Sequence, residues 1–157
     1  MLAEKILGKL NPSTEKEVDY VEIEWDEAFK KIHKKRTVNG KVLGIRLDNE
    51  VLTRGLRQDD VLYEDKKLVI AVRIPACTAM EITVDENHPQ MAAKVCYEIG
   101  NTHGALFWGE KPLQFLTPLN GPLQEKLQQL HGVTVCQKEV VFDFERKISS
   151  SVNGHHH

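Results

Sequence analysis

Histidine side chains offer the clearest chemistry in this sequence, and two placements stand out. His103 lies within the stretch EIGNTHGALFWGE (98–110), where a helix-like pattern stops and an apolar run begins. The last three residues are also histidines, His155, His156 and His157. Neutral imidazole is the commonest protein ligand for transition-metal ions such as nickel and copper. We therefore treat both groups as candidate metal ligands.

A single imidazole makes a poor site, because nickel- and copper-type ions take several nitrogen or oxygen donors. In a two-fold dimer, a residue near the symmetry axis meets its own copy. The apolar surface around His103 could supply the dimer contact. The spacing alone leaves open the alternative that His103 only packs against the run that follows it.

The histidine tail also has two interpretations. Three successive imidazoles at a chain end could wrap a divalent ion. The same letters, GHHH (154–157), could be the remnant of a purification tag. The polar segment 148–157 contains little that could join a core, and we expect it to be mobile.

The remaining candidates favour less specific roles. His33, His88 and His131 fall at a basic strand edge, near a helix start and after a helix end, so surface or capping positions are expected. The three cysteines are Cys77, Cys96 and Cys136, and they form no Cys-x-x-Cys pair, so neither a disulfide scaffold nor a closed zinc knuckle is predicted.

A cysteine enzyme is a rival hypothesis. Cys96 and His103 are seven residues apart and would share a helix face, as a thiol nucleophile and its base could. Gly100 is expected to interrupt that helix, however, and Cys96 falls within its apolar stripe. An inert core thiol is therefore favoured.

Composition limits the class of protein. The chain has 157 residues, of which 41% are hydrophobic and 28% charged, and this fits a soluble globular protein. A net charge of −2 gives no overall attraction to nucleic acid or to anionic lipid. No apolar run approaches the roughly 18 residues of a membrane span. A reducing, cytoplasmic setting is the default expectation.

The spacing of apolar residues and turn signals differs between the two halves of the chain and predicts an α+β protein with two domains. Residues 1–74 read as short strands, with Asn39-Gly40 as a hairpin turn, and predict a β-sandwich or barrel-like domain. A single helical turn within 26–32 stays open. Residues 75–147 give the order β-α-β-β-α-β of a ferredoxin-like domain. Its first helix, 90–99, is expected to stop at Gly100.

The stretch KVCYEIGNTHGALFWGE (94–110) resembles the helix-end motif of the UreE urease accessory proteins, which are nickel metallochaperones. VDYVEIEWDE (18–27), NGKVLGIRL (39–47) and LRQDDVLYEDKKLVIAV (56–72) are similar in kind and order to the N-terminal part of that family. The resemblance covers nearly the whole chain. It implies an N-terminal β domain that binds a partner and a C-terminal ferredoxin-like domain that binds metal and dimerises.

The resemblance also implies roles for single residues. His103 corresponds to the metal-binding histidine at the dimer interface, where two copies would hold one Ni²⁺. Gly100 and Asn101 correspond to framework residues of the loop, and the GHHH tail (154–157) is similar to the histidine-bearing tails of relatives. Thr102 departs from the family, which commonly has arginine there.

The implied function is delivery of Ni²⁺ for assembly of the urease active site, without catalysis. The implied partners are a second copy of the chain, the urease GTPase accessory protein and apo-urease. Sequence alone does not select nickel over Zn²⁺ or Cu²⁺, because the general affinity order places Cu²⁺ highest. The alternative is a non-catalytic interaction and dimerisation module in which Zn²⁺ or Cu²⁺ binding is incidental.

Overall fold

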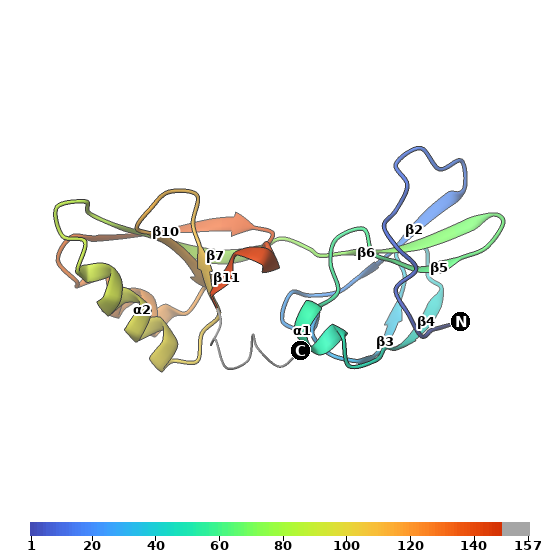
Figure 1. Cartoon of the computed structure of the whole chain (residues 1–157), viewed down its shortest axis with the longest axis horizontal. Coiled ribbons are helices and arrows are strands. Elements are labelled where there is room, and N and C mark those ends of the chain that lie inside the picture. The colour runs from blue at the N-terminus through green and yellow to red at the C-terminus, as the bar shows by residue number, and fades with distance from the viewer. Residues whose placement is uncertain (149–157) are drawn as a thin grey trace. The chain divides into compact units, whose positions relative to one another are not determined.

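A computed structural model describes residues 1–148 of the chain (Figure 1). The chain forms two compact units, Met1–Pro75 and Ala76–His157, which we call unit 1 and unit 2. Helices are few and strands many, so the α+β class predicted from the sequence is confirmed.

Unit 1 contains two three-stranded sheets. The first has the order β1 (Leu2–Ala3), β4 (Val42–Arg46) and β3 (Ile32–Arg36); the second has the order β2 (Glu17–Glu22), β6 (Leu68–Arg73) and β5 (Val61–Glu64). In each sheet the central strand has one parallel and one antiparallel neighbour. One short helix, α1 (Val51–Arg54), follows the first sheet in the chain.

The predicted hairpin is confirmed between β3 and β4. Gly40 has a φ of 90°, a value that glycine adopts without the steric cost of a side chain. The amide of Thr37 donates to the carbonyl of Lys41 at 2.7 Å and closes the turn. Residues 26–29 lie in turns, and no helix forms before β3 begins at Ile32, so the single helical turn that the sequence left open is absent.

The buried carboxylate of Asp60 links several segments of unit 1 through hydrogen bonds. Asp60 is fully buried, and Arg54 donates to both of its oxygens at 2.7 and 2.9 Å. The amide of Arg57 adds a hydrogen bond of 2.8 Å, and the ammonium of Lys9 lies 3.0 Å away. Burial opposes ionisation of Asp60, but these donors outweigh it, so the pKa of the carboxyl lies below its usual range.

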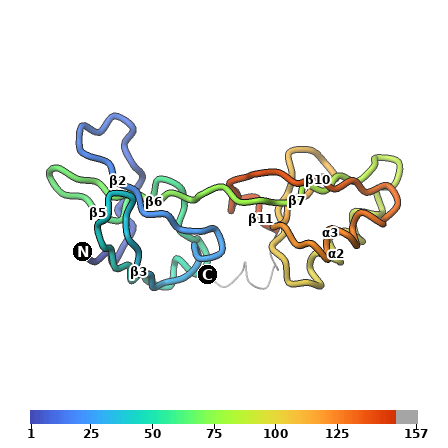
Figure 2. The backbone as a smooth tube through the Cα atoms, turned by 180° about the vertical axis from the view of Figure 1, so that it is seen from behind, coloured from blue at the N-terminus to red at the C-terminus, as the bar shows by residue number. Residues whose placement is uncertain are grey.

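Unit 2 has a five-stranded antiparallel sheet with the strand order β10-β7-β9-β8-β11. Its elements, in chain order, are β7 (Cys77–Val84), α2 (Met91–Asn101), β8 (Leu106–Trp108), β9 (Gln114–Pro118), α3 (Gly121–Gln128), β10 (Val133–Val140), η1 (Phe144–Arg146) and β11 (Lys147–Ile148). Figure 2 shows α2 and α3 together on one side of this sheet. The first six elements and their strand order reproduce the predicted ferredoxin-like arrangement.

Both helices press their apolar faces against the sheet. Val95 and Ile99 of α2, and Leu123 and Leu127 of α3, are buried in one core with strand residues such as Ile82. Asn120 caps α3, because its side-chain oxygen accepts from the amide of Leu123 at 3.1 Å.

The end of unit 2 adds a strand that the sequence pattern did not reveal. β11 pairs antiparallel with β8, and Ile148 packs against the core although the sequence placed it in the tail. Among residues 1–148, none of the helices has the length and apolar character needed to cross a membrane.

Candidate metal site

The loop that carries His103 follows α2 and is anchored in the core of unit 2. The prediction that Gly100 ends the helix is wrong, because α2 continues to Asn101. Gly100 has no positive φ and lies within the helix. The left-handed residue that turns the chain is His103, with a φ of 57°.

The hydrogen bonds identify this turn as a Schellman motif. The amide of Gly104 donates to the carbonyl of Ile99 at 3.2 Å, and the amide of His103 donates to the carbonyl of Gly100 at 3.0 Å. His103 thus occupies the position after the helix cap that glycine usually fills. Because Ile99 is fully buried, the motif fixes the backbone of His103 relative to the core.

Thr102 contributes to the same turn. Its hydroxyl donates to the carbonyl of Ile99 at 2.7 Å, and its amide donates to that carbonyl at 3.2 Å. A Cβ atom added at Gly104 would lie 3.3 Å from the Thr102 hydroxyl, so the turn leaves little room there. Thr102 therefore has a structural role in this turn.

The side chain of His103 contrasts with its fixed backbone. It is exposed, and among the described residues no hydrogen bond to its ring is found. Non-glycine residues in the left-handed region cost free energy, and such positions gather at functional sites. The last turn of α2 also carries no basic residue, so the negative end of the helix dipole would favour a cation at this point.

Residues 1–148 do not complete a metal site around His103 within one chain. In that part of the protein there is no group of three or more histidine, cysteine or acidic side chains placed to hold a metal ion. The predicted tail ligands His155, His156 and His157 lie outside the described residues. Further donors for an ion at His103 must therefore come from a second chain, from the tail or from water.

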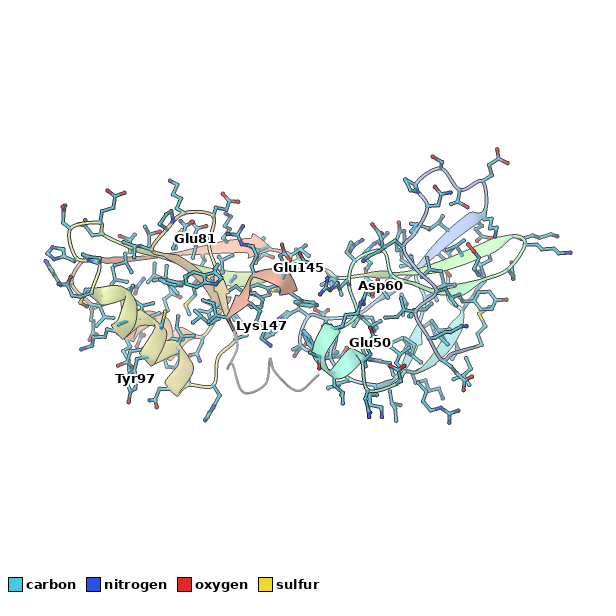
Figure 3. The ribbon with its side chains drawn as sticks, in the orientation of Figure 1. Glu50, Asp60, Glu81, Tyr97, Glu145 and Lys147 are labelled. Carbon is cyan, nitrogen blue, oxygen red and sulfur yellow. The ribbon has the colours of Figure 1, made fainter. Side chains whose placement is uncertain are left out.

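An exposed aromatic lies on the same helix. Tyr97 is 68% exposed, on the side of α2 that points away from the sheet (Figure 3). Asn101 and Gly100, one turn further along, are exposed as well. Tyr97 was not among the residues expected to be functional, although an aromatic outside the apolar stripe of 91, 95 and 99 is a signal of an exposed contact.

Cys96 does not have the properties of a nucleophile. It packs against the core of unit 2, and burial raises the pKa of its thiol. Less thiolate is then present at neutral pH, whereas reactive cysteines have a lowered pKa. Since His103 lies beyond the end of the helix, the common face that the cysteine-enzyme hypothesis required is absent, and the favoured core thiol fits the packing of Cys96.

His131 is exposed, as the sequence predicted, and His88 is half-buried, but the expected surface position of His33 is wrong. His33 is buried, because the alternation of β3 turns it inward, and its Nε2 lies 2.9 Å from the carbonyl of Lys30. His88 and His131 contact each other, with their Nε2 atoms 3.2 Å apart. The two residues are 43 positions apart in the sequence, and the pairing of the strands beside them brings them together.

Comparisons with known proteins cover both units. A family model described as the N-terminal domain of UreE urease accessory protein matches residues 3–75, and one described as its C-terminal domain matches residues 78–157. A curated urease accessory protein UreE from Helicobacter pylori strain Shi470 is 39% identical over 133 residues, which are 83% of this chain and 76% of the relative.

Two other Helicobacter proteins of the same name give similar values. The one from Helicobacter bizzozeronii is 35% identical over 131 residues, which span 83% of this chain and 73% of the relative. The one from Helicobacter acinonychis strain Sheeba is 38% identical over 133 residues, with 83% and 76% covered.

Proposed function

Because this chain belongs to the UreE family of urease accessory proteins, we propose that it binds Ni²⁺ and delivers it for assembly of the urease active site. The observation that carries the proposal is the left-handed, exposed His103, held by a Schellman motif on the buried Ile99. A histidine that binds a metal ion at the protein surface needs a fixed backbone and an imidazole ring that has no other hydrogen-bond partner.

A homodimer completes the site. Two copies of His103 near a two-fold axis anchor one Ni²⁺ between the protomers. The exposed side of α2, with Tyr97 at its centre, supplies apolar contact for this interface. Gly100 and Asn101 lie on the exposed surface beside His103, and the absence of a side chain at Gly100 allows a close approach of the second helix.

Release of the ion is as important as binding. Sites made of several cysteine thiolates hold zinc firmly in a closed tetrahedron. An open site of imidazoles exchanges its ligands more readily, and His155, His156 and His157 fill the remaining positions and then withdraw. The ion passes to the urease GTPase accessory protein and to apo-urease in the cytoplasm. No catalytic step is involved.

Unit 1 serves as the partner-binding region. β3 lies at the edge of its sheet and presents exposed Ile32, Lys34 and Arg36. An edge strand offers unpaired backbone groups, and its basic side chains favour an acidic partner segment.

Calorimetric titration of Ni²⁺ into the dimer tests the proposal. Wild type should show a tightest step of one Ni²⁺ per dimer, and His103→Asn should lose it. Asparagine tolerates the left-handed backbone but lacks the imidazole, so the turn is kept while the ligand is removed. Lys111→Ala, which changes an exposed residue in the turn between β8 and β9, is the control and should bind as wild type does. An unchanged step in His103→Asn would remove His103 from the site.

The tail is tested separately. Deletion of residues 155–157 should weaken Ni²⁺ binding or lower its stoichiometry, while the dimer persists in sedimentation. If the dimer were lost, the tail would have a structural role.

The exposed Tyr97 also suits the alternative of an interaction module with incidental metal binding. Equilibrium dialysis in which the dimer retained neither Ni²⁺ nor Zn²⁺ would favour that alternative.

A further inference from the structure

His88 and His131 belong to two turns that the sheet of unit 2 holds side by side. The pairing of Val84 with Val133 places the end of β7 beside the start of β10. The amide of Asp85 then donates to the carbonyl of Gly132 at 2.8 Å and ties the two turns together. In Figures 1 and 2 the turn before α2 and the turn before β10 meet at the same end of this unit.

Backbone geometry seats the ring of His88 at this junction. Gly132 has a φ of 74°, and a Cβ atom added to it would lie 3.1 Å from Cδ2 and 3.2 Å from Cβ of His88. The left-handed conformation therefore favours glycine at position 132, and the His88 side chain leaves little space beside it. On the other side, the amide of His88 donates to the carbonyl of Asp85 at 2.9 Å, so His88 is held from two directions.

The two rings bring their Nε2 atoms together. The nitrogen atoms are 3.2 Å apart, the ring centroids are 4.5 Å apart, and the planes are inclined at 67°. Bonds from imidazole nitrogen to a first-row transition metal are about 2.0–2.1 Å long. Two such bonds that meet at an angle between square and tetrahedral separate their nitrogens by about 3 Å, which is the spacing found here.

We infer that His88 and His131 form a second binding site, in which both Nε2 atoms hold one divalent first-row transition-metal ion. No histidine, cysteine or acidic residue within the described part of the chain joins them as a third ligand, so water completes the coordination. His131 is exposed and His88 half-buried, which leaves the ion open to solvent. By the general affinity order, Cu²⁺ should bind most tightly to this site, and Ni²⁺ and Zn²⁺ less tightly.

This site is separate from the one proposed for His103. His88 lies just before α2 and His103 just after it, and the 11 residues of that helix span about 16 Å. The second site also needs only one chain, whereas the His103 site depends on a dimer. The ion at His88 and His131 is thus bound at a distance from the proposed dimer contact.

Paramagnetic broadening in ¹H–¹⁵N spectra of the full chain locates bound Cu²⁺. Substoichiometric Cu²⁺ should broaden the amides of residues 85–88 and 130–133 in wild type, and at least as strongly in His103→Asn, which no longer competes for the ion. In His88→Gln/His131→Gln these amides should stay sharp, while broadening around residues 101–104 persists. In each single variant, the Cu²⁺ concentration that halves the intensity of these amide signals should rise by at least about tenfold. Only one ring then holds the ion, and chelation is lost.

Several results would overturn the inference. Sharp signals for 85–88 and 130–133 in wild type with one equivalent of Cu²⁺ would show that the rings only hydrogen-bond to each other. Persistent broadening there in the double variant would place the ion on other ligands. Because His103→Asn removes the other site, loss of binding around 101–104 and loss around 85–88 are distinguished in the same spectra. Unchanged chemical shifts elsewhere in unit 2 verify that the glutamine variants remain folded.

Discussion

In unit 1 the carboxylate of Asp60 is saturated: Arg54, Lys9 and a backbone amide all donate to it, and solvent does not reach it. In unit 2 the histidines of interest lie in turns: His88 and His103 flank α2, and His131 lies between α3 and β10. Their rings remain at least partly open to solvent. A saturated buried charge stabilises a fold and offers a ligand nothing. These imidazoles of unit 2 are more exposed than Asp60, and we propose them as metal ligands.

The largest effect that should follow from this contrast comes from Asp60→Asn. The variant leaves Arg54 without its buried charge partner, and the free energy of unfolding of unit 1 should fall by about 3 kcal/mol. Urea unfolding followed by the fluorescence of Trp25, in a Trp108→Phe background, measures unit 1 alone. Asp59→Asn, which changes the neighbouring residue, should alter stability little. Ni²⁺ binding by His103 should survive in Asp60→Asn.

The stabilisation from Asp60 should also depend on pH. The folded-state pKa of its carboxyl lies below the unfolded value of about 3.9, so the contribution is present above that value. It is lost as the pH falls through the folded pKa. The difference in unfolding free energy between wild type and Asp60→Asn should therefore be full at pH 7 and shrink in acid. A difference that grew toward low pH would contradict the assignment of an ionised carboxylate.

The sequence predicted the parts of the fold that local patterns encode. The strand 77–84 was located from its residues alone, and the hairpin at Gly40 from its turn chemistry. β11 was missed because two residues are too few to show the apolar–polar alternation of a strand. They form a strand only because they pair with β8. The burial of His33 was missed because a run of basic residues hid the alternation of β3.

In the candidate site, too, local sequence patterns predicted some features, and others depend on tertiary pairing. The position of His103 at a helix end follows from local pattern, and the loop was expected there. Gly100 was assigned the turn because glycine is the usual residue at a left-handed position, but the chain places His103 there and continues the helix through Gly100. The contact between His88 and His131 depends on the register of β7 and β10, which a single sequence does not specify.

A smaller effect should come from His103→Gly. Glycine adopts the left-handed conformation without strain, so the free energy of unfolding of metal-free unit 2 should rise by about 1 kcal/mol. Ni²⁺ binding should fall at the same time, because the ligand is lost. Urea unfolding followed by Trp108, in a Trp25→Phe background with a chelator present, measures the first effect. A variant no more stable than wild type would mean that His103 carries no conformational cost.

The smallest effect should come from Gly100→Ala, and it separates two roles for this glycine. A Cβ atom at position 100 would meet nothing within 4 Å in one chain, and alanine in a helix interior is favoured over glycine by about 0.5–1 kcal/mol. Unit 2 should become slightly more stable as a monomer. If two α2 helices approach closely beside His103, the added methyl should nevertheless weaken the dimer and its Ni²⁺ step. Gain of stability together with unchanged dimerisation and Ni²⁺ affinity would place the dimer contact elsewhere on unit 2.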